Sequence, residues 1–315
     1  MNISFIIIGK NTSKTLDTCI TSLQDAVLNT PIVSEYEIIY VDSKSTDDSV
    51  KIAKKYDIEL VKIINGYTTA SLGRYLGKKY AKYNNFVFID SDMYLDINWL
   101  NNSLEYYEKY GAIIGERHEK LYKNDIVFQE IPYFYGIEKV EIATNIGGFL
   151  MIKKEIIEDI NYSPIIKNEE EKDFYSKFLD KNKIYKIPEK AYIHNNRNLS
   201  ASRIKDYLHP FSKNGYILSL YNSIKSHYFL NYITLQKNYV LSMFVSILFY
   251  TFLLTGYYIG LVSILLIVLN GKKRIKGSLM TALFFPYKLI MTLVMINKKY
   301  SCKYIYKKET ICLDI

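Results

Sequence analysis

Short apolar runs alternate with segments of helical periodicity over residues 1–90 of the chain. The runs predict buried strands, and apolar residues that recur every three or four positions predict helices. In chain order the expected elements are a strand at Ile3–Ile8, a helix at Thr15–Ala26, a strand at Glu37–Val41, a helix at Asp47–Tyr56, a strand at Glu59–Ile63, a helix at Ser71–Lys82 and a strand at Phe86–Ile89. This order predicts an α/β fold in which helices cover both faces of a parallel sheet.

Residues 94–200 have a less regular pattern that fits the same domain. The expected elements are a helix at Trp99–Tyr110, strands at Ala112–Gly115 and Gly148–Ile152, a helix at Lys172–Asp180 and a strand at Ala191–Ile193. We therefore expect one domain over residues 1–200, followed by a basic helical linker over residues 201–238.

The pattern changes beyond Tyr239, where Val240–Leu269 is apolar and uncharged but interrupted at Gly256–Gly260. Its length exceeds the ~20 residues that a membrane-spanning helix needs. A second apolar stretch, Ser278–Ile296, contains Lys288. We expect residues 239–315 to form membrane-associated helices and a basic tail. A re-entrant hairpin over residues 240–269 and two ordinary spanning helices are both compatible with this pattern.

The net charge of +9 is concentrated in the same region, because residues 201–315 contain fifteen Lys and Arg residues but only three acids. Basic residues beside apolar segments favour an anionic membrane surface on the cytoplasmic side of the cell membrane. The remaining residues are acidic on balance, which argues against nucleic acid as a partner. Three scattered cysteines also fit a reducing compartment.

Acidic residues follow two of the expected strands. Asp42 comes directly after the second strand, and Asp90-Ser91-Asp92 comes directly after the fourth. Ligands bind at the carboxyl ends of the strands in open α/β sheets. Carboxylate oxygens suit Mg²⁺ or Mn²⁺, which proteins often share with substrate phosphates. Taken alone, the D-x-D is more typical of a solvated turn with helix-capping acids than of a metal site, and the segment that follows Asp42 is also typical of a capped loop.

Together these segments resemble those of the family 2 glycosyltransferases, which have the GT-A fold. The matching motifs are Ile8-Gly9-Lys10-Asn11 after the first strand, Val41 to Ser49 with Ser43 in place of an Asp, Arg74-Tyr75-Leu76-Gly77 with Tyr75 in place of an Asn, and the D-x-D of Asp90 and Asp92. Their order and spacing agree with the family over about residues 1–200. The resemblance implies a nucleotide-diphospho-sugar transferase fold with a mixed, mainly parallel sheet.

The resemblance also implies roles for individual residues. Asp42 and Asn11 would line the nucleotide pocket, with Arg74 nearby. Asp92 would be the main metal ligand, Asp90 would support the ribose or the metal, and His194 would reach the metal or the diphosphate. Gly147 and Gly148 would face the donor sugar and the acceptor, and Arg197 would hold the diphosphate. Simpler structural roles, such as helix packing for Arg74 or a turn for the glycines, stay open.

A general base is expected in the acidic segment that opens the helix predicted at Lys172–Asp180. The family's pattern aligns best with Asp173, and a slip in register makes Glu171 the alternative. A solvated acidic helix start is the structural alternative.

The expected function is transfer of a sugar from a nucleoside-diphosphate donor, with UDP as the family's usual nucleotide and guanine or thymine nucleotides as the alternatives. The reaction would depend on a metal and invert the anomeric centre, and the acceptor would be lipid-linked or a surface glycan. A non-catalytic membrane scaffold with the same fold is the main alternative. The loop after the first strand lacks the G-x-G-x-x-G of dinucleotide-dependent oxidoreductases. The sequence does not define the oligomeric state.

Overall fold

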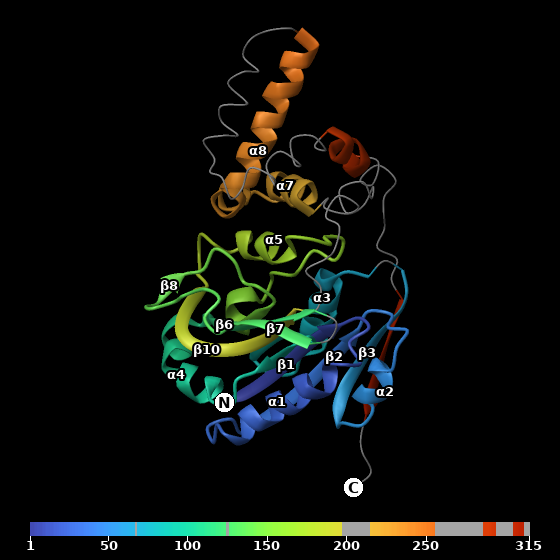
Figure 1. Ribbon diagram of the computed structural model, residues 1–315, viewed down its shortest axis with the longest axis vertical. Helices are drawn as coiled ribbons and strands as arrows, with labels where there is room; N and C mark the ends of the chain where they lie inside the picture. Colours follow the sequence, from blue (N-terminus) through green and yellow to red (C-terminus); the bar gives the residue numbers. More distant parts are fainter. Residues whose placement is uncertain (67, 124–125, 197–214, 256–285, 294–304, 312–315) are drawn as a thin grey trace. The chain divides into compact units, whose positions relative to one another are not determined.

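A computed structural model describes the chain except at residues 67, 124–125, 197–214, 256–285, 294–304 and 312–315 (Figure 1). It divides into two compact units. The first contains residues 1–165, 178–201 and 302–315, and the second contains residues 166–177 and 202–301. A boundary near residue 201 was expected, but the assignment of residues 166–177 and 302–315 differs from the domain boundaries expected from the sequence.

The first unit is built on one sheet, which has eleven strands within the described residues. These are β1 (Asn2–Gly9), β2 (Glu35–Asp42), β3 (Ile58–Asn65), β4 (Asn85–Asp90), β5 (Met93–Leu95), β6 (Ala112–Lys123), β7 (Ile126–Ile131), β8 (Glu141–Ile142), β9 (Phe149–Lys153), β10 (Tyr185–Asn196) and β11 (Ile305–Ile311). The order across the sheet is β11-β3-β2-β1-β4-β9-β6-β10-β5, with β7 beside β6 and β8 beside β10.

The parallel half of the sheet is the one that the sequence predicts. Strands β3, β2, β1 and β4 run parallel to one another. The helices between them are α1 (Leu16–Leu28), α2 (Ser49–Ala53) and α3 (Ala70–Tyr80), and α4 (Trp99–Tyr110) follows β5. The alternation of strands and helices expected over residues 1–90 is therefore confirmed.

Alternate residues of β1 show that helices cover both faces of the sheet. Phe5 belongs to the same buried cluster as Leu16 and Ile20 of α1. The next residue, Ile6, lies against Gly77 of α3, where a Cβ atom would come within 2.2 Å of it. Since successive side chains of a strand point to opposite faces, α1 and α3 pack on opposite sides of β1.

The other half of the sheet is mixed, and the sequence predicts less of it. β9 runs antiparallel to both β4 and β6, whereas β10 runs parallel to β6. The strand expected at Ala112–Gly115 continues to Lys123 and then pairs with β7, which was not expected. A 3₁₀ turn over Lys154–Ile157 follows β9.

A strand from the C-terminal region completes one edge of the sheet. β11 runs antiparallel to β3 over its whole length. Lys79 Nζ donates a hydrogen bond to Tyr306 Oη over 2.7 Å, and Lys308 Nζ lies 3.0 Å from Glu59 Oε2. The pairing covers backbone groups of β3 that would otherwise form an open edge.

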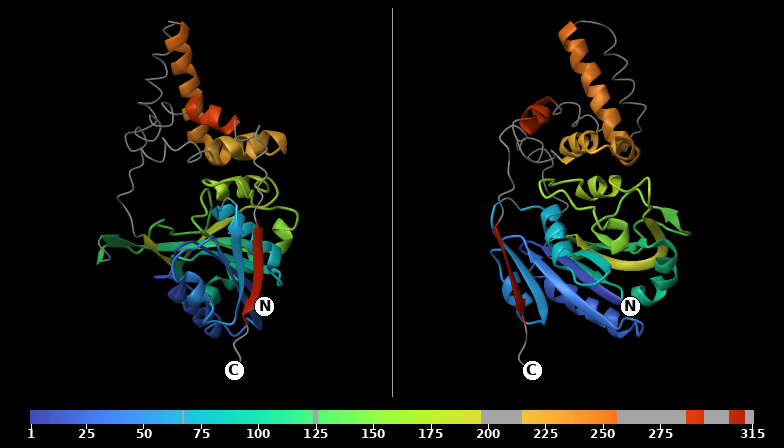
Figure 2. Two further views of the ribbon diagram at one scale, coloured as in Figure 1. Left: turned by 90° about the vertical axis from the view of Figure 1, so that its right-hand side faces the viewer. Right: turned by 180° about the vertical axis from the view of Figure 1, so that it is seen from behind.

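The second unit is helical in its described parts. It contains α5 (Glu170–Ser176), α7 (Gly215–Lys225) and α8 (Phe229–Thr255), and residues 286–293 are also helical. α5 begins near the expected position but ends before Asp180. Asn231 of α8 donates a hydrogen bond to the carbonyl oxygen of Ser176 over 3.0 Å. Figure 2 shows these helices from two further directions.

None of the helices in the described part of the chain combines the length and the apolar character needed to cross a membrane. The interruption at Gly256–Gly260 and much of the second apolar stretch lie outside the described residues.

Deleting residues 302–315 tests the role of β11. We expect the truncated protein to aggregate and to unfold at least about 3 °C lower, because the edge of β3 is exposed. Differential scanning calorimetry and light scattering measure both effects. Truncation after Ile311 keeps β11 and is the matched control. Equal unfolding temperatures for the two truncations would contradict a stabilising role for β11.

Candidate functional site

The carboxyl ends of three neighbouring parallel strands, β2, β1 and β4, lie side by side at one end of the sheet. In the strand register Gly9 of β1 lies opposite Asp42 of β2, and Ile8 lies opposite Asp90 of β4. Backbone hydrogen bonds continue the alignment past the strand ends, from Ser43 N–H to Gly9 O over 2.8 Å and from Ser91 N–H to Ile8 O over 3.0 Å. The sheet therefore brings Asp42 and the D-x-D segment to one edge, as the sequence predicts.

The loops after β1 and β2 are joined by side chains that bond to backbone groups. Asp42 is 3% exposed, and its Oδ2 accepts a hydrogen bond from Ser45 N–H over 3.1 Å. Asn11 has a φ of 55°, its N–H donates to Ser45 Oγ over 2.8 Å and its Oδ1 accepts from Thr46 N–H over 2.8 Å. Both residues thus hold the loops after β1 and β2 in place.

Asp90 is held by a buried arginine. Arg74 of α3 is 2% exposed, and its Nη2 lies 2.7 Å from Asp90 Oδ1. Its guanidinium also lies 5.7 Å from the centre of the Tyr162 ring. A buried cation needs a partner of opposite charge, so the pair fixes the position of the Asp90 carboxylate. The structure therefore places Arg74 directly beside the D-x-D segment.

The Gly147-Gly148 turn approaches the same carboxylate. The two residues have φ values of 73° and 85°, in the left-handed region that favours glycine. A Cβ atom on Gly148 would lie 2.5 Å from Asp90 Oδ2, and one on Gly147 would lie 2.2 Å from Tyr135 Oη. Glycine is thus required here both for backbone conformation and for space.

Asp92 is linked to a chain of charged side chains. Its Oδ2 lies 3.3 Å from His194 Nε2, and His194 Nδ1 lies 3.1 Å from Glu119 Oε1. Burial alone would lower the pKa of His194, but hydrogen bonds to Asp92 and Glu119 raise this pKa to about 9. His194 is therefore protonated near neutral pH, with each ring nitrogen donating to a carboxylate. Metal ligation requires a neutral imidazole, so it would require this arrangement to change.

Glu119 and Arg117 are site residues that the sequence analysis did not identify. Arg117 Nη2 lies 2.7 Å from Glu119 Oε1, and both side chains are largely buried. They lie in β6, beyond the end expected for that strand at Gly115. Charged residues directly after an apolar run were the available signal, the same one that identified Asp90.

No cluster of three or more His, Cys, Asp and Glu side chains suited to a metal ion occurs among the described residues. Asp92 nevertheless presents a carboxylate that is 43% exposed at the end of the sheet. Mg²⁺ can bind through one or two protein carboxylates together with water and substrate phosphates. The donor set of Asp90 and Asp92 is chemically suited to such an ion.

The two candidate general bases belong to the second unit. Asp173 of α5 is fully buried, with Tyr228 Oη donating to its Oδ1 over 3.2 Å and Lys177 Nζ 3.1 Å from its Oδ2. Burial, followed by the charge of Asp173, raises the pKa of Tyr228. Glu171 is half-buried on the same helix. Arg197 lies outside the described residues.

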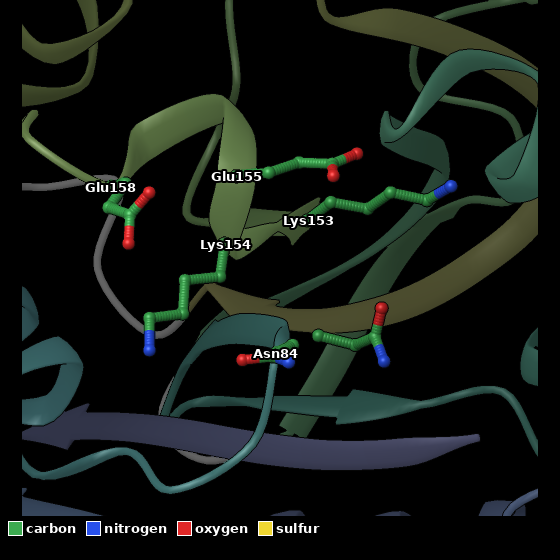
Figure 3. Close-up of a pocket in the computed structure, with 6 residues that line it drawn as sticks. Asn84, Lys153, Lys154, Glu155 and Glu158 are labelled. Atoms are coloured by element: carbon green, nitrogen blue, oxygen red, sulfur yellow. The ribbon is translucent and has the colours of Figure 1, made fainter.

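A surface pocket of about 370 Å³ lies elsewhere on the first unit (Figure 3). Its lining residues are Asn84, Asn85, Lys153, Lys154, Glu155 and Glu158. Asn85 is the first residue of β4, so the pocket lies at the opposite end of that strand from Asp90. Lys153 and Lys154 extend in different directions in Figure 3 rather than converging on one point. This pocket is therefore separate from the candidate site.

The mixed α/β sheet, with acidic residues at the ends of its parallel strands, is that of the GT-A class of glycosyltransferase folds. A comparison with protein families shows that Glycosyl transferase family 2 matches residues 4–160. The chain therefore belongs to glycosyltransferase family 2. A comparison with curated proteins found no significant match.

Solved structures of S. aureus TarS, residues 1–349, have a similar fold. The complex with UDP-GlcNAc is 17% identical, with a TM-score of 0.56 over 75% of this chain and 72% of that one. The complex with UDP is 16% identical, with a TM-score of 0.55 over 98% and 96%. At this level of identity the likeness concerns the fold alone.

Replacing Gly148 with Ala tests the close approach to Asp90. A residue other than glycine at positive φ costs about 1–2 kcal/mol, and the new methyl group would also displace the Asp90 carboxylate. We therefore expect a loss of about 2–4 kcal/mol in the free energy of unfolding, measured with urea.

Gly136→Ala is the matched control, because Gly136 has a φ of 62° and a Cβ atom there would meet nothing within 4 Å. It carries the cost of the backbone conformation without the collision. Equal losses for the two variants would show that contact with Asp90 does not matter at position 148.

Proposed function

We propose that this chain transfers a sugar from a nucleoside-diphosphate donor, with UDP as the nucleotide, to a lipid-linked or surface-glycan acceptor. The observation that carries the proposal is the position of Asp90 and Asp92 at the end of β4, with Asp42 at the same end of β2, within a family 2 domain. The TarS complexes with UDP and UDP-GlcNAc support the choice of donor, because that protein shares the fold. Direct displacement would invert the configuration of the anomeric carbon.

Asp92, supported by Asp90, would hold a Mg²⁺ or Mn²⁺ ion. The ion would supply positive charge that stabilises the departing diphosphate. Arg74 keeps the Asp90 carboxylate in place, and His194 does the same for Asp92. The protein's part is thus to present two acidic groups in fixed positions before the donor arrives, which removes the need to reorganise them during the reaction.

The rest of the donor would lie along the same sheet edge. Asp42 and Asn11 shape the loops where the nucleotide base and ribose are expected, and the Gly147-Gly148 turn, which packs against Tyr135 and Asp90, lies where the sugar is expected. Small residues allow a ligand to approach the backbone closely. This arrangement supports a donor that extends from the loop after β2 to the turn before β9.

Proton removal from the acceptor hydroxyl is assigned to Asp173 or Glu171. A base must come within hydrogen-bonding distance of the proton that it takes. Asp173 would have to exchange its contact with Tyr228 for one with the acceptor, whereas Glu171 is more exposed. We retain both residues as candidates for the base.

Replacing Asp92 with Asn tests the proposed donor site. We expect UDP-GlcNAc to bind the protein in the presence of Mn²⁺, and the substitution to weaken binding by at least about tenfold, because an amide is a poorer ligand for a hard cation. Titration calorimetry measures the affinity, and chelation of the metal should reproduce the loss in the unchanged protein.

Asp57→Asn is the control, since Asp57 is an exposed acid at the start of β3, the end of the strand away from the site. The proposal fails if the unchanged protein neither binds nor cleaves any of a panel of UDP-, GDP- and dTDP-sugars with Mg²⁺ or Mn²⁺. A non-catalytic scaffold would give that result.

We further propose that the C-terminal region attaches the protein to the cytoplasmic face of the cell membrane. The uncharged stretch at residues 240–269 and the basic cluster at residues 272–276 support this placement. The pairing of β11 with β3 supports it as well, because residues 202–301 are then joined to the first unit at both ends. A segment that enters the membrane between those ends has to return to the same side.

Flotation of the full chain with phosphatidylserine-rich vesicles tests this attachment. We expect the protein to float with the vesicles, and replacement of Lys272, Lys273, Arg274 and Lys276 with Gln to weaken binding most at low ionic strength, where charge attraction is least screened. Protein that stays at the bottom of the gradient with vesicles of every composition would contradict membrane attachment.

A further inference from the structure

Two exposed aromatic rings lie in the loop between β7 and β8. Tyr133 is 68% exposed and Phe134 is 44% exposed. Large aromatic residues usually bury most of their area, so two adjacent exposed rings are typical of an interaction site. The β6–β7 hairpin that leads to this loop extends beyond the neighbouring strands (Figure 2).

A buried carboxylate fixes the backbone of this loop. Glu116 of β6 is 1% exposed. Its Oε1 accepts a hydrogen bond from Tyr135 N–H over 2.6 Å, and its Oε2 accepts one from Ile137 N–H over 2.8 Å. Phe134 N–H donates to the carbonyl oxygen of Arg117 over 2.8 Å. The two exposed rings are therefore carried by an ordered backbone, so a ligand would not have to order it on binding.

One set of contacts connects the loop to Asp90. Tyr135 Oη lies 3.4 Å from Tyr192 Oη, which donates to the carbonyl oxygen of Gly147 over 3.2 Å. The next residue, Gly148, packs directly against the Asp90 carboxylate. The aromatic loop and the first acid of the D-x-D segment thus contact the same two-residue turn.

A second set of contacts connects the loop to Asp92. The guanidinium of Arg117 lies 3.9 Å from the centre of the Phe134 ring and 5.2 Å from that of Tyr135. The same guanidinium pairs with Glu119, which contacts His194 and through it Asp92. Both acids of the proposed donor site are therefore joined to the loop through short contacts within one compact unit.

We propose that Tyr133 and Phe134 bind the sugar ring of the acceptor, stacking against its apolar face. This rests on the function proposed above, since an acceptor has to lie close to the donor. A pyranose ring presents C–H groups on its faces and hydroxyl groups around its edge. Tyr133, which is 68% exposed, combines an aromatic face with a phenolic hydroxyl group, and Phe134 adds a second aromatic face beside it. This mixture suits a carbohydrate better than a lipid or an apolar peptide.

An array of immobilised oligosaccharides, ending in glucose, galactose, N-acetylglucosamine or mannose, tests the proposal without a donor. We expect the full chain to be retained by at least one of these glycans. The double variant Tyr133→Ala, Phe134→Ala should lose at least about tenfold of that retention, as expected when the main aromatic contacts of a site are removed. Because both side chains are exposed, the variant should fold, and unfolding in urea checks this.

Phe128→Ala is the matched control, since Phe128 of β7 is 49% exposed but lies outside the loop. It should leave retention unchanged. The proposal is overturned if no glycan retains the unchanged protein, if the double variant is retained equally well, or if Phe128→Ala causes the same loss.

Titration of the same proteins with UDP-GlcNAc and Mn²⁺ separates this proposal from the proposed function. The double variant should bind the donor as tightly as the unchanged protein. Glycan binding that depends on the two rings, in a protein that binds no nucleotide sugar, would leave the carbohydrate site standing and refute the transferase. Donor binding with no glycan retention would refute the carbohydrate site and leave the proposed transferase function standing.

Discussion

The Asp90 carboxylate is fixed between a buried arginine and a glycine backbone, and the rest of the site depends on that constraint. Arg74 is buried on α3 and needs the negative charge of Asp90. Its position is set by the close packing of α3 on β1, where Gly77 lets the helix approach Ile6. Gly148 meets the same carboxylate from the turn before β9. The packing of α3 on the sheet therefore also sets the position of the Asp90 carboxylate in the site.

The parallel half of the fold could be predicted because its strands are buried on both faces. Such strands appear as uninterrupted apolar runs, as at Phe5–Ile8 and Phe86–Ile89. The mixed half could not be predicted in the same way. β6 continues through charged residues beyond Gly115, β7 is almost wholly exposed and β11 pairs with a strand more than two hundred residues earlier. β6 beyond Gly115 and β11 have no apolar run, and the apolar residues of β7 are exposed rather than buried.

The site was partly predictable for a related reason. Asp42 and Asp90 follow strands whose parallel pairing can be predicted, so their proximity followed from chain order. The importance of Glu116 and Glu119 depends instead on contacts with residues distant in the sequence, among them His194. The contact of Asp173 with Tyr228 is likewise long-range. Residue type and spacing indicate which groups can carry out chemistry, but only packing shows which partners already occupy them.

Several of these contacts pair an acidic side chain with a basic one. Asp90 is paired with Arg74, and Asp92 shares His194 with Glu119, which in turn holds Arg117. Each carboxylate thus has a cation beside it, so mutual repulsion between the acids is reduced while they stay near the surface. Because Arg117 also stacks on Phe134, the network that keeps Asp92 in place ends at the exposed aromatic loop. The position of Asp92 and that of the proposed acceptor surface are therefore both linked to the same strand, β6.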